Sequence, residues 1–233
     1  MRITTVGLDA DDTLWHNETI FRLTHERLRS LMTGVADPEV VDARLAEIES
    51  RNLRLYGYGV KGFTLSMLET VMELTDNQPP GRIIAEILAA GREMLTEPVE
   101  PLPGVEDALA ALAEGGYRLV LITKGDLLHQ EQKLAASGLG DLFAAVEIVS
   151  EKDAGTYERV FARHGTGAAE AVMCGNSVKS DILPALKAGA FAAYVPYPLI
   201  WAHEVADTPE GDPRYVQLET LRDLPPWLRS LAA

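Results

Sequence analysis

Hydrophobic positions follow two different patterns of spacing along the chain, and each pattern predicts a different kind of structure. Between residues 17 and 98 the apolar positions recur at helical spacing, and no stretch there has the pattern of a strand. This segment therefore predicts four helices, at about 20–31, 38–48, 64–74 and 81–95.

In the rest of the chain, short apolar runs alternate with amphipathic stretches. The runs predict strands at 3–8, 119–123, 146–149, 171–174 and 192–195. The amphipathic stretches predict helices at 105–114, 126–136, 154–164, 180–188 and 221–231, the last interrupted by Pro225 and Pro226. Strands separated by helices join through right-handed crossovers into a parallel sheet. We therefore expect an α/β fold: a three-layer, Rossmann-like parallel sheet core from residues 1–16 and 99–233, with residues 17–98 inserted as an all-helical subdomain.

Polar side chains follow four of the predicted strands at the point where each strand ends. Asp9, Asp11 and Asp12 follow the first, and Thr123-Lys124-Gly125-Asp126 follows the second. The next two are followed by Ser150-Glu151-Lys152-Asp153 and by Gly175-Asn176-Ser177, with Asp181 shortly after. Because ligands bind beyond the carboxyl ends of parallel strands, we expect these groups to converge on one site.

The residue types at these strand ends are typical of phosphoryl chemistry. Asp9 and Asp11 are two residues apart, so in an extended loop both side chains face the same point, where a cation or a proton must offset their repulsion. Mg²⁺ prefers such oxygen ligands, and Asn176 offers another. Lys152 and Thr123 supply a positive charge and a hydroxyl for phosphoryl oxygens. Lys124 either reaches the phosphate or faces solvent.

Composition narrows the class of protein. Of 233 residues, 47% are hydrophobic and 24% charged, as in ordinary globular domains rather than disordered or fibrous chains. Lys and Arg number 21 against 35 Asp and Glu, so the net charge of −14 argues against nucleic acid and anionic membranes as partners. The single cysteine, Cys174, excludes an internal disulfide. Without an apolar leader or a long apolar segment, we expect a cytoplasmic protein.

These residues resemble the motifs of the haloacid dehalogenase-like (HAD) hydrolase superfamily. Its first motif, Asp-x-Asp-x-Thr, is matched by residues 9–13, and its second, a Ser or Thr after a strand, by Thr123. The third, a Lys before a helix, is similar to Lys152, and the fourth, an acidic loop, to residues 175–181. The four occur in the family order over most of the chain. The helical segment 17–98 occupies the position of a cap domain between the first two motifs.

The resemblance implies roles for these residues. Asp9 would be the nucleophile, Asp11 the acid and then the base, and Thr123 and Lys152 the groups that hold the phosphoryl oxygens. Mg²⁺ would be bound by Asp9, the Asp11 carbonyl and Asn176, with Asp181 orienting metal-bound water. Two positions depart from the family pattern: Lys124 replaces a frequent Asn, and Asn176 replaces a metal-binding Asp, which implies weaker Mg²⁺ binding.

We therefore predict a Mg²⁺-dependent phosphatase acting on a small phosphorylated metabolite, as a monomer or a homodimer. Lys61, in the aromatic and glycine-rich segment 56–63, either meets a second anionic group of the substrate or belongs to a helix–helix turn. The alternatives are a phosphomutase acting on sugar phosphates, a 2-haloacid dehalogenase, which Asp11 disfavours, and a catalytically weakened phosphate-binding protein, which Asn176 keeps open. A phospho-accepting receiver domain is usually smaller and lacks an inserted helical segment.

Overall fold

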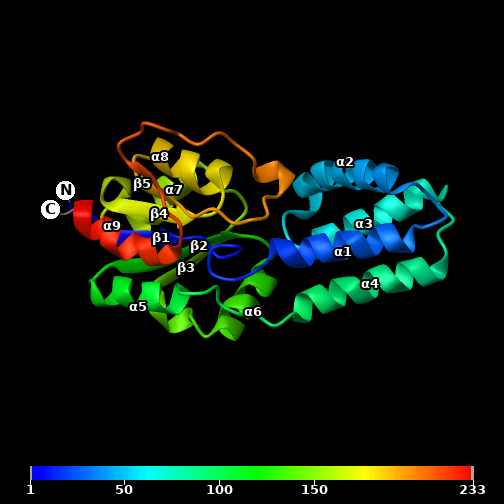
Figure 1. The fold of residues 1–233 in the computed structure, drawn as a ribbon, viewed down its shortest axis with the longest axis horizontal. Helices are drawn as coiled ribbons and strands as arrows, with labels where there is room; N and C mark the ends of the chain where they lie inside the picture. The colour runs from blue at the N-terminus through cyan, green and yellow to red at the C-terminus, as the bar shows by residue number, and fades with distance from the viewer. Residues whose placement is uncertain (1, 232–233) are drawn as a thin grey trace. The chain divides into compact units, whose positions relative to one another are not determined.

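The computed structural model describes residues 2–231, which fall into two compact units. The α/β unit contains the residues up to Glu18, Val99–Lys124 and the residues from Gln130 onward. The helical unit contains Thr19–Pro98 together with Gly125–His129. Figure 1 shows the elements along the chain.

A six-stranded, fully parallel sheet forms the centre of the α/β unit, in the order β3-β2-β1-β4-β5-β6. The strands are β1 (Thr5–Leu8), β2 (Arg118–Lys124), β3 (Ala145–Val149), β4 (Ala171–Gly175), β5 (Phe191–Tyr194) and β6 (Tyr215–Gln217). The first strand lies between β2 and β4, with Leu8 in register with both Leu121 and Cys174. The chain leaves β1 toward β2 and β3 and later returns to its other side, which makes this edge the topological switch point where open parallel sheets bind ligands.

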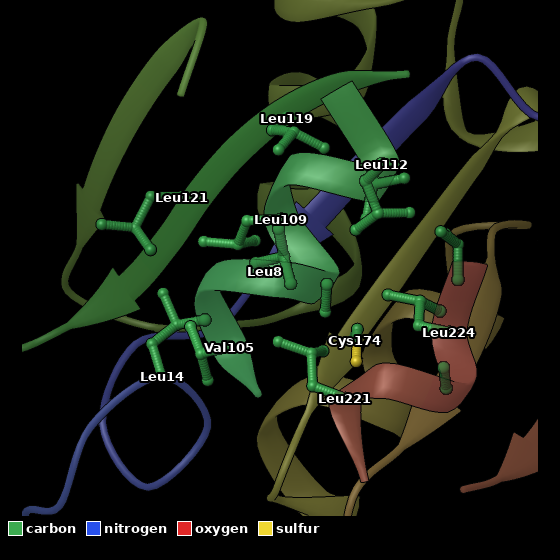
Figure 2. Close-up of a cluster of buried hydrophobic side chains, with 14 of the residues drawn as sticks. Leu8, Leu14, Val105, Leu109, Leu112, Leu119, Leu121, Cys174, Leu221 and Leu224 are labelled. Atoms are coloured by element: carbon green, nitrogen blue, oxygen red, sulfur yellow. The ribbon is translucent and has the colours of Figure 1, made fainter. Parts of the chain in front are cut away.

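Helices cover both faces of the sheet because side chains alternate along each strand (Figure 1). The helices of the chain are α1 (Glu18–Leu31), α2 (Pro38–Tyr56), α3 (Val60–Leu74), α4 (Gly81–Thr96), α5 (Val105–Glu114), α6 (Leu127–Ser137), α7 (Ala154–His164), α8 (Leu183–Lys187) and α9 (Leu224–Leu231). Figure 2 shows one face, where Leu121 and Cys174 pack with Leu109 of α5 and Leu224 of α9. On the other face, Ile122 of β2 packs with Phe161 of α7.

Gly7 keeps the helical layer close to β1. A Cβ atom at this position would lie 2.9 Å from Ile122 Cδ1 and 3.1 Å from a ring carbon of Phe161. Glycine is therefore required by the close approach of its neighbours and not by an unusual backbone angle. This close packing fixes the position of β1, which leads into the residues at its carboxyl end.

The helical unit has its own apolar core, formed by all four of its helices. Leu28 of α1, Leu45 of α2, Met67 of α3 and Ile87 of α4 are among its buried side chains. Within each helix, the buried positions recur at the spacing of one helix face, as the sequence predicts. Among the described residues, none of the helices combines the length and apolar character needed to cross a bilayer.

The parallel sheet and flanking helices that the sequence predicts are confirmed, with local differences. The sixth strand, β6, was not predicted, since three residues after Pro213 carry too short a pattern. The predicted helix at 180–188 is a π-helical turn, Val178–Ile182, followed by the short α8. Pro225 and Pro226 do not interrupt the last helix: they lie in the first turn of α9, where a missing N–H removes no helical hydrogen bond.

Candidate active site

The loop after β1 is held in a tight turn that fixes its acidic side chains. Asp9 N donates to Cys174 O at 2.9 Å, which continues the pairing of β1 with β4. Asp12 adopts a left-handed backbone conformation, with φ of 60°. Its buried carboxylate accepts hydrogen bonds from the main-chain N–H groups of Asn17 (2.8 Å) and Glu18 (3.0 Å), at the start of α1. Asp12 therefore stabilises a helix N-terminus.

Asp9 and Lys152 form a buried ion pair at the carboxyl end of β1. Lys152 Nζ donates to Asp9 Oδ1 and, at 2.7 Å, to Asp181 Oδ1. Burial raises the pKa of the Asp9 carboxyl, and the adjacent Lys152 ammonium opposes this rise. Burial alone would lower the pKa of Lys152, but Asp181 and Asp9 raise it above its usual range. The lysine is therefore held as a cation between the two carboxylates.

Asp181 is completely buried and ties the loop after β4 to Lys152. Its Oδ2 accepts a hydrogen bond from Ser177 N at 3.0 Å, so both carboxylate oxygens already have protein donors. Gly175 allows this arrangement, since a Cβ there would lie 2.2 Å from Asp181 Oδ2. The structure therefore places Asp181 where it orients Lys152 and the Asn176 loop, and its predicted metal role stays a prediction.

Three oxygen-bearing groups converge on the other side of Asp9. With its amide nitrogen turned toward them, Asn176 donates to Asp9 Oδ2 and to the main-chain carbonyl of Asp11, each at 3.2 Å. Turning the amide presents its oxygen there instead. One carboxylate, one carbonyl and one amide are hard oxygen donors, and Mg²⁺ commonly takes only one or two carboxylates and completes its shell with water and phosphate. The residues therefore fit Mg²⁺, although within residues 2–231 no group of three His, Cys, Asp or Glu side chains is placed to hold a metal.

The side chain of Asp11 faces a different set of partners from that of Asp9. Its Oδ1 accepts from Trp15 Nε1 at 2.8 Å and from Lys133 Nζ at 2.5 Å, and its Oδ2 accepts from Gln130 Nε2 at 3.2 Å. Gln130 also contacts Thr123 Oγ1 at 2.7 Å, so Asp11 and Thr123 meet through one amide. Sequence reasoning missed Gln130 and Lys133. The available signal was their spacing of three residues, which puts two polar side chains on one face of a helix.

Lys124 already has an anionic partner. Its Nζ lies 2.6 Å from Glu204 Oε1 and 2.9 Å from Ser180 Oγ, and Glu204 also accepts from the hydroxyls of Ser177 and Ser180. Burial would raise the pKa of Glu204, but Lys124 and the two hydroxyls lower it below its usual range. Glu204 comes from the segment between β5 and β6, far along the chain, and sequence reasoning did not find it. A contact between Lys124 and substrate stays a prediction.

Lys61 belongs to the helical unit and pairs there with Asp126. Its Nζ lies 2.9 Å from Asp126 Oδ1. Segment 56–63 contains the turn between α2 and α3, and Phe63 is buried against Phe21. The helix–helix turn, one of the two interpretations of this segment from the sequence, is therefore present. A contact between Lys61 and substrate stays a prediction.

Comparison with known proteins identifies relatives over nearly the whole chain. A family model described as haloacid dehalogenase-like hydrolase matches residues 3–189. A solved haloacid dehalogenase-like family hydrolase from Xanthomonas campestris is 42% identical, with a TM-score of 0.88 over 98% of this chain and 91% of that one.

Two further relatives bear on the chemistry. A glyceraldehyde 3-phosphate phosphatase from Methanothermobacter thermautotrophicus is 32% identical over 104 residues, which are 42% of this chain and 45% of that protein. This chain thus spans less than half the length of that relative. An L-2-haloacid dehalogenase from Xanthobacter autotrophicus shares the fold, with 17% identity and a TM-score of 0.66 over 98% of this chain and 99% of that one. The fold alone therefore does not separate phosphate chemistry from dehalogenation.

Proposed function

We propose that this chain, which belongs to the haloacid dehalogenase-like hydrolase family, is a Mg²⁺-dependent phosphatase that hydrolyses a small phosphorylated metabolite. The observation that carries the proposal is the asymmetric surroundings of Asp9. Its Oδ1 faces the Lys152 ammonium, while its Oδ2 faces the Asn176 amide and the Asp11 carbonyl lies beside that amide. A carboxylate between a fixed cation and a cluster of hard oxygen donors suits attack on a phosphoryl group.

Asp11 favours phosphate over halide chemistry. A phosphate ester leaves as an alkoxide, which needs a proton, whereas a halide leaves without one. The Asp11 carboxylate is a second acidic group at this site, two residues from Asp9 and held by three donors of its own. The phosphatase relative, although it matches less than half of the chain, points to the same substrate class.

The chemistry proceeds in two displacements at phosphorus. In the first, a carboxylate oxygen of Asp9 forms a bond to phosphorus as the ester oxygen departs, and Asp11 gives that oxygen its proton. In the second, water attacks the same phosphorus, Asp11 takes a proton from the water, and the acyl phosphate bond breaks to release phosphate and free Asp9.

The remaining groups bind and orient the phosphoryl group. Lys152, fixed by Asp181, offers its ammonium to a phosphoryl oxygen, and the hydroxyl of Thr123 offers a hydrogen bond to another. Asp9, the Asp11 carbonyl and Asn176 would hold Mg²⁺, which when bound neutralises charge on the carboxylate and the phosphate. Because Asn176 carries no charge, we expect weaker Mg²⁺ binding than with a second carboxylate.

Phosphate release from p-nitrophenyl phosphate, measured with and without Mg²⁺, tests the proposal. We expect Mg²⁺-dependent release that Asp9→Asn abolishes. Asp153→Asn is the matched control: it makes the same change in an exposed N-cap residue next to Lys152, and Asn also caps helices. Chloride release from 2-chloropropionate is measured in parallel.

Four results would contradict the proposal. Chloride release without phosphate release would indicate a dehalogenase. An isomerised sugar phosphate in place of free phosphate would indicate a phosphomutase. Equal turnover in the wild type and Asp9→Asn would remove Asp9 from the chemistry. A folded but inactive protein that has lost Mg²⁺ binding by calorimetry would favour a phosphate-binding protein.

A further inference from the structure

The Asp11 carboxylate is held by more donors than its position in an acidic turn requires. Trp15, four residues along the same loop, donates to Oδ1 at 2.8 Å. Two more donors come from α6, more than 110 residues away in sequence: Lys133 reaches Oδ1 at 2.5 Å and Gln130 reaches Oδ2 at 3.2 Å. Donors to both oxygens, from two separate segments, fix the plane of this carboxylate and its rotation about the Cβ–Cγ bond.

Lys133 is buried, which is unusual for a lysine. Only 8% of its surface is exposed, and its Nζ has Asn17 Oδ1 at 3.2 Å as a further acceptor. Burying an ammonium is unfavourable unless a counter-charge and hydrogen bonds offset the loss of water. The carboxylate of Asp11 is the counter-charge here, so the two side chains hold each other in place.

Gln130 joins the Asp11 carboxylate to Thr123, near the end of β2. It is also buried, and its Nε2 lies 2.7 Å from Thr123 Oγ1 and 3.0 Å from Lys124 O, in addition to Asp11. An amide nitrogen carries two hydrogens, and here they serve acceptors on both the β1 loop and the end of β2. A displacement of Gln130 would therefore move Asp11 and Thr123 together.

We propose that Lys133 and Gln130 are positioning residues for Asp11: they hold its carboxylate, ionised in this ion pair, in the orientation from which it takes a proton from the attacking water and then gives that proton to the leaving oxygen of the next substrate. This inference rests on the proposed phosphatase function. A proton donor must lie within hydrogen-bond reach of the oxygen that it protonates. Neither α6 residue is assigned to the phosphoryl group itself: Lys133 acts through Asp11, and Gln130 acts through Asp11 and Thr123.

A positioning role has a signature that a purely structural role lacks. Esters of acidic phenols leave without help from a proton donor, whereas esters of weakly acidic phenols depend on it. Displacing Asp11 therefore slows poor leaving groups far more than good ones. A protein that is merely less folded loses activity on all esters by the same factor.

The experiment measures the burst of phenol released in the first turnover, in the presence of Mg²⁺, for aryl phosphates from 2,4-dinitrophenyl to phenyl phosphate. For Lys133→Met we expect the phenyl phosphate rate to fall about 100-fold and the dinitrophenyl rate to fall less than about 3-fold, with KM changed less than about 3-fold. Gln130→Ala should show the same selectivity for poor leaving groups on top of a smaller loss on all esters, because Thr123 also loses a partner. Lys133→Arg keeps a cationic donor and should recover part of the loss. Gln132→Ala, an exposed residue of the same helix, and Lys187→Met, an exposed lysine, should behave as the wild type.

A double-mutant cycle tests that Lys133 acts through Asp11. Added to Asp11→Asn, Lys133→Met should lower the phenyl phosphate rate by less than about 3-fold, because the group that it positions is already lost. An equal loss on all esters, or full additivity with Asp11→Asn, would overturn the inference while leaving the phosphatase function standing. A wild-type enzyme with no Mg²⁺-dependent phenol release from any ester would overturn the proposed function, and this inference with it.

Discussion

Replacing Gly175 by alanine should disrupt the acidic end of the site without touching Asp9 directly. A Cβ at position 175 would lie 2.2 Å from Asp181 Oδ2, 2.4 Å from Cγ and 2.9 Å from Cβ. The backbone of Gly175 is not in the left-handed region, so alanine itself can adopt it. The whole effect should therefore come from the displacement of Asp181.

The size of the effect follows from the hydrogen bonds that Asp181 would lose. A carboxylate forced aside by about 1 Å loses its hydrogen bonds from Ser177 N (3.0 Å) and Lys152 Nζ (2.7 Å). Hydrogen bonds to charged groups contribute about 1.5–3 kcal/mol each, and alanine regains about 0.4–1 kcal/mol through the unfolded chain. We expect the free energy of unfolding to fall by about 3–5 kcal/mol. Turnover should fall as well, because Lys152 loses one of the two carboxylates that hold it.

Urea denaturation followed by tryptophan fluorescence measures this change in the right part of the molecule. All three tryptophans, Trp15, Trp201 and Trp227, lie in the α/β unit, so the signal reports on that unit. Gly155→Ala is the matched control: it lies in α7, where a Cβ meets its nearest neighbour at 3.6 Å, and alanine should stabilise by up to about 1 kcal/mol.

A second variant separates the steric cause from other effects. In an Asp181→Ala background the carboxylate is gone and only the 2.9 Å contact with the Cβ at position 181 remains, so Gly175→Ala should cost less than about 2 kcal/mol there. A Gly175→Ala protein within about 1 kcal/mol of the wild type, or an undiminished cost in the Asp181→Ala background, would refute the reasoning.

Three further substitutions test other parts of the structure. Burial raises the pKa of Glu49 to about 7. An acid whose pKa is raised in the folded state destabilises that state once the acid ionises. Relative to the wild type, the free energy of unfolding of Glu49→Gln should therefore rise by on the order of 1–2 kcal/mol as pH rises from about 4.5 to 7, and no further above pH 7, as measured by circular dichroism melts. Burial opposes ionisation of Glu204, but Lys124 and two hydroxyls lower its pKa overall. Glu204→Gln should therefore be less stable than the wild type at neutral pH, and the difference should shrink as pH falls below about 4.5; a constant difference would contradict this. Gly7→Ala should lower the free energy of unfolding by about 1–3 kcal/mol in the fluorescence assay, because its Cβ would lie 3.1 Å from Phe161. An unchanged denaturation midpoint would show that the neighbouring side chains move aside without cost.

The fold was predictable because its signals are local. The alternation of apolar runs with amphipathic stretches can be recognised from neighbouring residues, and it predicts parallel strands joined by helices. The family and the strand ends that carry Asp9, Thr123, Lys152 and Asn176 were accessible in the same way, since a motif needs only its own residues and their order. Strand β6 was missed because three residues carry no period to detect.

The partners of those side chains were decided by tertiary structure alone. In the sequence, Lys133 is one more polar position of an amphipathic helix, yet in the structure it contacts Asp11. Glu204 is one more charged residue in a loop, yet it contacts Lys124. Such pairs depend on how segments 80 to 122 residues apart are brought together by the sheet. The sequence by itself determined which chemical groups stand at the strand ends. Only the tertiary structure decided which of these side chains are fixed, which partners fix them and how they are oriented. Burial and hydrogen-bond geometry arise between distant segments and leave no local pattern in the sequence.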